Sequence, residues 1–204
     1  MQLRRQILME IQKDRDNDLV DKDLIKDAIQ QFLYMGFEKL AEIRKPQGSH
    51  TIQWFGEKNL EKYDTEFEKY LKESTTEFYR KSAELWRNTF SCEDYIRKVA
   101  QHLLKEERNA DDFLQEQTKS RIIDIVLKEA VENQAEQLTL KETGCEYMFN
   151  QRKINELKEM YEVFSRVETT LKYVINKMTP FIMDEGRKII KNEDNLKDPL
   201  KFTA

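Results

Sequence analysis

Apolar residues recur at helical spacing from Tyr63 to Gly186, and no strand-like segment interrupts them. The first part of this stretch spaces its aromatic and aliphatic side chains by four, three, one, seven and seven residues, at Tyr63, Phe67, Tyr70, Leu71, Phe78 and Leu85. Such spacings place side chains on one face of an α-helix. Because several segments of the same kind follow, the pattern predicts an all-α fold.

The composition supports long helices. The chain of 204 residues contains only 5 Gly and 3 Pro, too few for the turns of an all-β fold. Charged residues make up 36% and hydrophobic residues 39%, which is polar for a globular protein. We therefore expect helices that each have one solvated face and one buried stripe.

The amino-terminal part predicts two helices. The first runs from Gln2 to Arg15, and the polar run Asp14–Asp18 ends its pattern. Asp21 is placed to cap the second helix, which carries apolar residues on its inner side. Gly36, followed by Phe37, is typical of a Schellman-type helix end.

Residues 38–62 predict an irregular loop. Pro46, Gly48 and Gly56 are loop signals in this segment. It also contains the adjacent aromatic residues Trp54 and Phe55. These two side chains either pack back onto the helices or form an exposed docking site, since contiguous exposed apolar surface often marks an interface.

Three further helices follow this loop. Thr65 and Glu68 fit a capping box at the start of a helix that ends near Trp86 or Asn88. Ser91 and Asp94 resemble a second capped start. A third helix begins near Ser120 and continues to about Leu138; Thr143 and Gly144 then close it, and a loop leads to Ile154.

The carboxyl-terminal pattern is long enough for two helices. Apolar residues continue from Ile154 to Ile182, and the join is expected at Glu168–Thr170, with Thr169 or Thr170 as the cap. Pro180 lies inside the second helix and should kink it, or restart it after a Thr179 cap. The charged tail from Asn192 to Ala204 is expected to fray.

Charge and cysteine content restrict the environment and the partners. The net charge of -4 argues against nucleic-acid binding. Cys92 and Cys145 do not make a disulfide framework, which favours a reducing compartment. No apolar run approaches the roughly 20 residues of a membrane span, and the start lacks the features of a signal peptide. We expect a cytoplasmic or nuclear protein without a membrane partner.

No residue pattern indicates catalysis, a cofactor or a metal. His50 and His102 lack close cysteine or carboxylate partners at metal-ligand spacing, and the usual phosphate-loop and hydrolase motifs are absent. Pairs of carboxylates are expected to be solvated surface rather than acid/base dyads: Glu106–Glu107, Asp111–Asp112 and Glu73–Glu77. We therefore expect no catalytic, cofactor-binding or metal-binding residues.

Several other side chains have a structural and a functional interpretation. Met160, Tyr161, Met178 and Met183 are expected to pack in the core rather than to line a cofactor site. Arg166, close to a helix end, either caps carbonyls or pairs at the surface, or it forms a buried bridge between helices.

The order of these segments resembles the amino-terminal region of the cullin family. ILMEIQKDRDNDLVDKDLIKDAIQQFLYMGF is similar to the family's helix, "ERxG" loop, helix and terminal "LGL". Similar family segments correspond to FEKYLKESTTEFY, YIRKVAQHLLKEERNADDFL and INELKEMYEVFSRVETTLKYV. Each motif alone is weak, because it is mostly helix core, but together they cover nearly the whole chain in order.

The chain departs from the family pattern at several positions. Gln117 and Thr118 replace a Ser-Thr pair, Lys158 and Thr170 replace glycines, and the 38–62 loop is longer than usual. Pro180 is also unusual within its helix. These departures concern close packing in the final helices and indicate a divergent member.

The resemblance implies stacked five-helix cullin repeats forming an elongated helical stalk. Residues 1–62 would end a first repeat, 63–167 would form the second, and 168–204 would start a third. The implied function is a non-catalytic scaffold segment of a cullin–RING ubiquitin ligase. In a complete cullin, the partners are a BTB- or Skp-type substrate adaptor and a RING-box protein, and we expect both contact regions to be missing from this fragment or truncated member.

Two other classes of function remain open on the residues alone. One is an unrelated helical protein-interaction or tethering module, which an exposed apolar groove near Trp54 and Phe55 would favour. The other is a small helical enzyme, which would need a deep pocket with convergent carboxylates.

Overall fold

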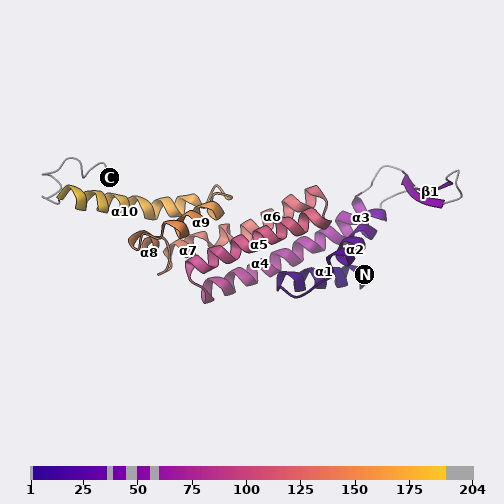
Figure 1. Ribbon diagram of the computed structural model, residues 1–204, viewed down its shortest axis with the longest axis horizontal. Helices are drawn as coiled ribbons and strands as arrows, with labels where there is room; N and C mark the ends of the chain where they lie inside the picture. Colours follow the sequence, from indigo (N-terminus) through magenta and orange to yellow (C-terminus); the bar gives the residue numbers. More distant parts are fainter. Residues whose placement is uncertain (1, 36–38, 45–49, 56–59, 192–204) are drawn as a thin grey trace. The chain divides into compact units, whose positions relative to one another are not determined.

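The computed structural model describes residues 2–35, 39–44, 50–55 and 60–191, and most of these residues are helical (Figure 1). The amino-terminal helices are α1 (Gln2–Arg15) and α2 (Lys22–Tyr34). The remaining helices are α3 (Glu61–Tyr63), α4 (Lys69–Thr89), α5 (Cys92–Phe113), α6 (Glu116–Ala130), α7 (Ala135–Leu140), α8 (Cys145–Asn150), α9 (Ile154–Phe164) and α10 (Leu171–Lys191). The sequence pattern predicted α1 with the same bounds. The expected stop at Gly36 and the tail 192–204 lie outside the described residues.

A β-hairpin lies where an irregular loop was expected. Strand β1 (Lys39–Arg44) pairs antiparallel with β2 (His50–Phe55), and Lys39 lies opposite Phe55. The strands contain β-branched and aromatic residues, which favour extended backbone, and the loop signals Pro46 and Gly48 lie between them in the sequence. The expectation of a wholly irregular segment is therefore wrong. The side chains of Trp54 and Phe55 lie outside the described structure, so their docking role stays a prediction.

The chain divides into two compact units. The first comprises residues 1–79 and 102–126, and the second comprises residues 80–101 and 127–204. Helices α4, α5 and α6 contribute residues to both units. Each unit combines separate segments that pack together, whereas the expected repeats at 1–62, 63–167 and 168–204 are consecutive segments of the chain. The division into units does not test those repeats, which stay a prediction.

The core of the first unit joins α1 and α2 to the aromatic side chains that precede α4. Phe32 stacks on Phe67 with ring centroids 5.4 Å apart, and Tyr63 lies 5.5 Å from the same ring. The buried cluster consists of Ile7, Ile11, Ile25, Ile29, Phe32, Leu33, Tyr63, Phe67, Leu71 and Ile122. Half of the stripe predicted from Tyr63 onward is buried here; Tyr70 and Phe78 are half-buried, and Leu85, further along α4, is 62% exposed. Ala83 and Trp86 are buried on that part of α4 instead.

The core of the second unit surrounds Tyr95 on α5. Its ring meets Trp86 edge to face, with centroids 6.5 Å apart, and its hydroxyl donates to the carbonyl of Ala130 at 2.8 Å. Burial raises the pKa of the Tyr95 phenol, so the side chain stays a neutral donor. An aromatic ring with a satisfied hydroxyl can thus be fully buried without an energetic penalty for the polar atom.

Two of the predicted helix caps are confirmed. The Asp21 carboxylate accepts from the backbone N–H of Leu24 at 3.0 Å, and the Ser91 hydroxyl accepts from that of Asp94 at 3.1 Å. The capping box at Thr65 is wrong. The Thr65 hydroxyl instead donates to the carbonyl of Glu61, because helical backbone already begins at α3 and continues through a π-helical turn at Asp64–Glu68.

The end of the third predicted helix is more broken than expected. Helix α6 ends at Ala130, and the chain continues through a 3₁₀ turn at Glu132–Gln134 into α7. Gly144 then precedes α8, which replaces part of the predicted loop. A Cβ at Gly144 would lie 2.5 Å from the carbonyl oxygen of Leu138, so only glycine fits this close approach.

The predicted join between the last two helices is confirmed, but not the expected caps. The buried Thr170 hydroxyl donates to the carbonyls of Phe164 and Val167, so it closes the end of α9 rather than capping α10. Helix α10 then continues through Pro180 without restarting. The alternative in which Pro180 begins a new helix is therefore wrong.

Candidate functional site

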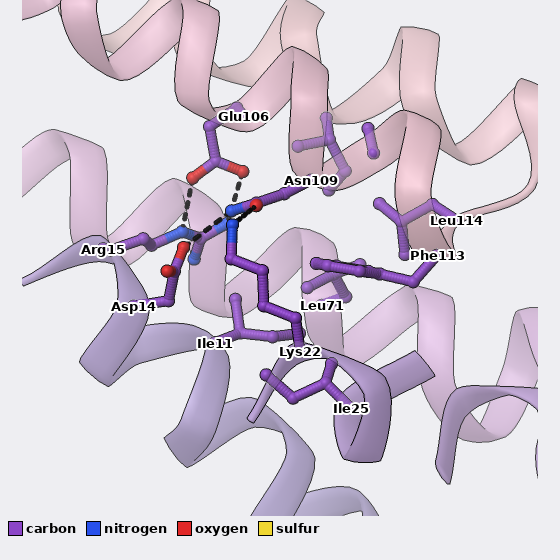
Figure 2. Close-up of a pocket in the computed structure, with 12 residues that line it drawn as sticks. Ile11, Asp14, Arg15, Lys22, Ile25, Leu71, Glu106, Asn109, Phe113 and Leu114 are labelled. Carbon is purple, nitrogen blue, oxygen red and sulfur yellow. Dashed lines mark hydrogen bonds and ion pairs between the residues drawn. The ribbon is translucent and has the colours of Figure 1, made fainter. Parts of the chain in front are cut away.

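The main polar feature inside the first unit is a buried group of side chains between α1, α4 and α5, which we call the Arg15 cluster. Figure 2 shows part of this cluster, with Asp14 and Arg15 facing Glu106 and Asn109. Its members are all no more than 7% exposed: Asp14, Arg15, Thr75, Tyr79, Glu106 and Asn109. Residues this polar are rarely buried unless they are paired.

Arg15 and Glu106 form the centre of the cluster. The Arg15 Nε donates to Glu106 Oε1 at 2.6 Å, and Nη2 donates to Glu106 Oε2 at 3.3 Å. Nη2 also donates to the Thr75 hydroxyl at 2.8 Å. Two nearly parallel bonds between a guanidinium and a carboxylate fix the orientation of both groups. The pair thereby sets the position of the end of α1 against α4 and α5.

The protonation of the cluster follows from its surroundings. Burial disfavours the charged form of Arg15, but the charge and hydrogen bonds of Glu106 outweigh this effect and raise the pKa of the guanidinium. The Tyr79 hydroxyl donates to Glu106 Oε1 at 2.8 Å. Burial, and then the negative charge of Glu106, raise the pKa of Tyr79. Arg15 therefore stays charged and Tyr79 stays neutral.

Asp14 and Asn109 extend the cluster. Asn109 Nδ2 donates to Asp14 Oδ2 at 2.7 Å, and Lys22 Nζ donates to Asn109 Oδ1 at 2.8 Å. Lys105 Nζ lies 3.5 Å from Asp14 Oδ2 and also donates to the backbone carbonyl of Asp14. These contacts bind both ends of the α1–α2 connection to α5.

The space beside the cluster is too small for a substrate. The cavity that Figure 2 shows, lined also by Ile11, Leu71 and Phe113, has a volume of about 10 Å³. That volume holds about one water molecule, whereas small-molecule sites are roughly 300–1,000 Å³. The arrangement can hold helices together, but it cannot take up a reactant.

The expected surface carboxylates are only partly confirmed. Asp111, Asp112, Glu73 and Glu77 are exposed, as predicted. Glu106 is 6% exposed and belongs to the Arg15 cluster, so the prediction of a solvated surface was wrong for this residue. Its partner is an arginine 91 residues earlier rather than the adjacent carboxylate.

A second buried carboxylate was also not predicted. Glu68 is 1% exposed, and Arg121 Nη1 donates to both of its oxygens, at 2.7 and 3.0 Å. Lys72 Nζ, four residues further along, lies 3.8 Å from Glu68 Oε1. A spacing of four residues accounts for this contact, but the shorter contact comes from α6, which local spacing does not reveal.

His102 and the two cysteines are buried in the described structure. His102 is buried beside the rings of Phe78 and Tyr79, at centroid distances of 6.3 and 6.0 Å, and the side chain of His50 lies outside the described structure. Cys92 and Cys145 are buried free thiols, and burial raises the pKa of Cys92 to about 12 and that of Cys145 to about 11. The described residues contain no group of three or more side chains that could hold a metal ion.

The expected core residues of the last helices divide into two groups. Met160 is fully buried, with its sulfur 3.5 Å from that of Cys145. Tyr161, Met178 and Met183 are 57%, 41% and 54% exposed, so their predicted burial is wrong within the described residues. Arg166 is exposed, which excludes the buried bridge considered for it. Such a bridge is made by Arg15 instead.

None of the described helices is long and apolar enough to cross a membrane. Amphipathic helices packed around the buried Arg15–Glu106 pair define a mainly helical class of protein. The family model "Cullin alpha solenoid domain" matches residues 1–203, and the chain belongs to the cullin family. This membership confirms the resemblance and the all-α class, and it excludes the alternative of an unrelated helical module.

Three curated relatives illustrate the similarity. Cullin-3 of Dictyostelium discoideum is 26% identical and Cullin-3A of Arabidopsis thaliana is 24% identical, both over 94% of this chain. Putative cullin-like protein 2 of Arabidopsis thaliana is 23% identical over 91% of the chain. The chain spans 22% and 23% of the first two proteins and 44% of the third.

Proposed function

We propose that this chain is a non-catalytic scaffold segment of a cullin–RING ubiquitin ligase. In this role it holds a substrate adaptor and the module formed by the RING-box protein and the ubiquitin-conjugating enzyme at a fixed separation. The observation that carries the proposal is the match of the cullin solenoid model to residues 1–203. The chain makes and breaks no bond and needs no cofactor.

The interior of the first unit supports a scaffold role. A spacer must resist bending, and its helices must therefore keep one arrangement. The Arg15–Glu106 pair fixes α1 to α5, and Arg121–Glu68 fixes α6 to the turn before α4. Moving α1 away from α5 would leave Arg15 or Glu106 buried without its partner, which costs about 3–5 kcal/mol.

The proposed partners are proteins alone. They are a BTB- or Skp-type substrate adaptor and a RING-box protein, and we expect neither to contact residues 1–204. The proposed location is the cytoplasm, the nucleus or both. The process is ubiquitin-dependent protein degradation, in which the substrate is selected by the adaptor and not by this chain.

Affinity purification from the native host, followed by mass spectrometry, tests the proposal. The endogenous gene product carries an epitope tag, and ubiquitin transfer is measured on the purified complex. We expect a RING-box protein and an adaptor in the complex, and we expect transfer to stop when the RING-box protein is removed.

The matched control is the 204-residue chain expressed alone with the same tag. We expect it to recover neither partner and to transfer no ubiquitin. Ubiquitin transfer by the 204 residues without a RING-box protein would show that the chain is catalytic. A full gene product that recovers neither partner would overturn the scaffold role itself.

A further inference from the structure

An open groove lies along the outer face of α1, beside α4, within the first unit. Its volume is about 680 Å³, which falls within the usual range for a bound ligand. The lining includes Leu8 and Met9 on the apolar side and Arg4, Arg5 and Lys13 on the basic side, with Ser74 from α4. We call this surface the α1 groove.

The helical spacing explains why one helix presents both kinds of side chain. Ile7 and Ile11 occupy the buried face of α1, whereas Arg5, Leu8 and Met9 follow one another at i, i+3 and i+4 on another face. Met9 is 45% exposed, and Leu8 is half-buried. A methionine is flexible and polarisable, so it adapts to differently shaped apolar side chains.

The charge of the groove opposes that of the chain. The protein carries a net charge of -4, but no carboxylate lines the groove among the described residues. Arg4 is held in place, because Nη1 bonds Glu66 at 3.3 Å and its guanidinium lies 3.6 Å from the centre of the Tyr70 ring. The groove therefore has a basic rim on a predominantly acidic protein.

Arg5 is the cation available to a partner. It is exposed, and no hydrogen bond or ion pair links it to another residue in the described part of the chain. Lys13, by contrast, pairs with Glu10 at 2.7 Å. A carboxylate that approaches Arg5 gains a charge-assisted bond without breaking an existing one.

We propose that the α1 groove binds an acidic amphipathic segment of a protein partner. The apolar side of that segment covers Leu8 and Met9, and its carboxylates face Arg5 and Lys13. A nucleic acid fits less well, because its affinity depends on many phosphate contacts and this groove offers few cations beside an apolar floor. This interaction is separate from the adaptor and RING contacts of the proposed function.

Selection from a random peptide library displayed on phage tests the proposal, because such a library does not require that the partner be identified first. The full 204-residue chain serves as bait, and the double variant Arg5→Glu/Met9→Glu serves for counter-selection. We expect the wild-type chain to enrich peptides that combine glutamate or aspartate with leucine-like residues. Enrichment of basic or uncharged peptides alone, or identical enrichment by the double variant, would overturn the proposal.

Fluorescence anisotropy with one selected, labelled peptide then locates the contact. We expect Arg5→Glu to weaken binding at least about tenfold, because it places like charges together. Lys26→Glu is the matched control, since Lys26 is an exposed cation on α2, and it should leave the affinity unchanged. Circular dichroism verifies that each variant is folded.

Two further probes distinguish other occupants. The same anisotropy assay uses a labelled DNA duplex, and a flotation assay uses vesicles that contain phosphatidylserine. We expect neither to bind in an Arg5-dependent way. Arg5-dependent binding of the duplex or the vesicles, without binding of acidic peptides, would contradict the assignment to a protein segment.

Discussion

Arg15 and Glu106 show that burying a charged side chain costs free energy unless a partner of opposite charge is buried with it. Removing either side chain from water disfavours its charged form, and only the opposite charge at hydrogen-bonding distance compensates for this. The two residues are 91 positions apart, and both are almost fully buried. A single replacement of Arg15 or Glu106 therefore lowers the stability by more than the loss of one contact would, because the other charge stays buried without its partner.

Arg15→Met should lower the free energy of unfolding by about 3–5 kcal/mol, because Glu106 would remain buried without its partner. Urea denaturation followed by circular dichroism measures the change. Adding Glu106→Leu to Arg15→Met should restore a large part of the loss, since the uncompensated charge is then gone.

Lys13→Met provides the matched control on the same helix. The Lys13–Glu10 pair has side chains that are 49% and 33% exposed, so this change should cost less than about 1 kcal/mol. Equal losses for Arg15→Met and Lys13→Met would show that the Arg15 cluster is not energetically special.

The buried thiol of Cys92 predicts a loss of stability in alkaline solution. Burial, followed by the charge of Cys145, raises the pKa of Cys92 from 9.0 to about 12. Between these two values the unfolded chain loses a proton that the folded chain keeps, so stability declines as pH rises. The expected slope for one such group is about 1.4 kcal/mol per pH unit.

Urea denaturation of the wild-type chain and of Cys92→Ala, at intervals from about pH 8 to about pH 11, measures this slope. We expect the variant to be less stable at the lower end of this range because of the cavity, but to lose stability less steeply as the pH rises. Parallel curves for the two proteins would contradict the assignment of the titrating group.

The residues of the Arg15 cluster could not be predicted from the sequence. Arg15 lies in the run from Asp14 to Asp18, which has the composition of a solvated turn, and Glu106 adjoins another glutamate. Helical periodicity assigns a face to each residue, but only the packing of α1 against α5 shows that these two faces meet. Burial of a polar residue is decided by a partner that is distant in sequence.

At the scale of single elements, local chemistry was most informative at helix starts. Asp21 and Ser91 cap their helices as predicted, because a cap depends on neighbours within three residues. Threonine is also a common capping residue, but the hydroxyls of Thr65 and Thr170 donate to carbonyls that precede them in the chain. Whether a threonine begins or closes a helix depends on the backbone before it, which residue type alone does not specify.

Ser91→Ala should lower the free energy of unfolding by about 1 kcal/mol, because the backbone N–H of Asp94 loses its acceptor. Chemical denaturation measures the loss, and Ser91→Asp should retain most of the stability. Ser120→Ala is the control: its exposed hydroxyl only donates to the carbonyl of Gln117, so we expect a change within about 0.5 kcal/mol. A similar loss in both variants would contradict the cap.

Pro180→Ala should stabilise α10. Proline inside a helix lacks the backbone N–H and crowds the carbonyl four residues earlier, which costs about 3 kcal/mol relative to alanine. Pro180 is exposed, so the change removes little packing. Hydrogen exchange should become slower across α10 and stay unchanged in α5; an unchanged or faster exchange in α10 would show that the proline is accommodated without cost.

At the scale of the whole molecule, the surface is less polar than the composition suggests. No residue of α10 is fully buried, although Phe181 stacks on Phe149 of α8 with centroids 5.4 Å apart. Ile175, Met178 and Ile182 follow helical spacing and are 56%, 41% and 53% exposed. The sequence predicted the helical spacing of this stripe, but the expected burial of Met178 is wrong, because periodicity cannot tell whether another element covers the stripe.

The exposed stripe of α10 should bind an apolar fluorescent dye such as anilinonaphthalene sulfonate. Replacing Ile175 and Ile182 by lysine should remove about half of the dye fluorescence or more, because contiguous apolar surface favours such binding. Leu24→Lys is the control, since Leu24 is 63% exposed on α2, outside the stripe. Dye fluorescence that is lost equally in the control would contradict the assignment to α10.

The Arg15–Glu106 pair also restricts how this chain can diverge from its relatives. A mutation at either position alone leaves a charge inside the protein, and about 3–5 kcal/mol is a large share of the stability of a typical domain. Substitutions at the two positions are therefore expected to depend on each other, although the positions lie 91 residues apart. Lineages should keep both residues or exchange both, and a change at one should survive only where the other has already changed or a stabilising substitution has come first.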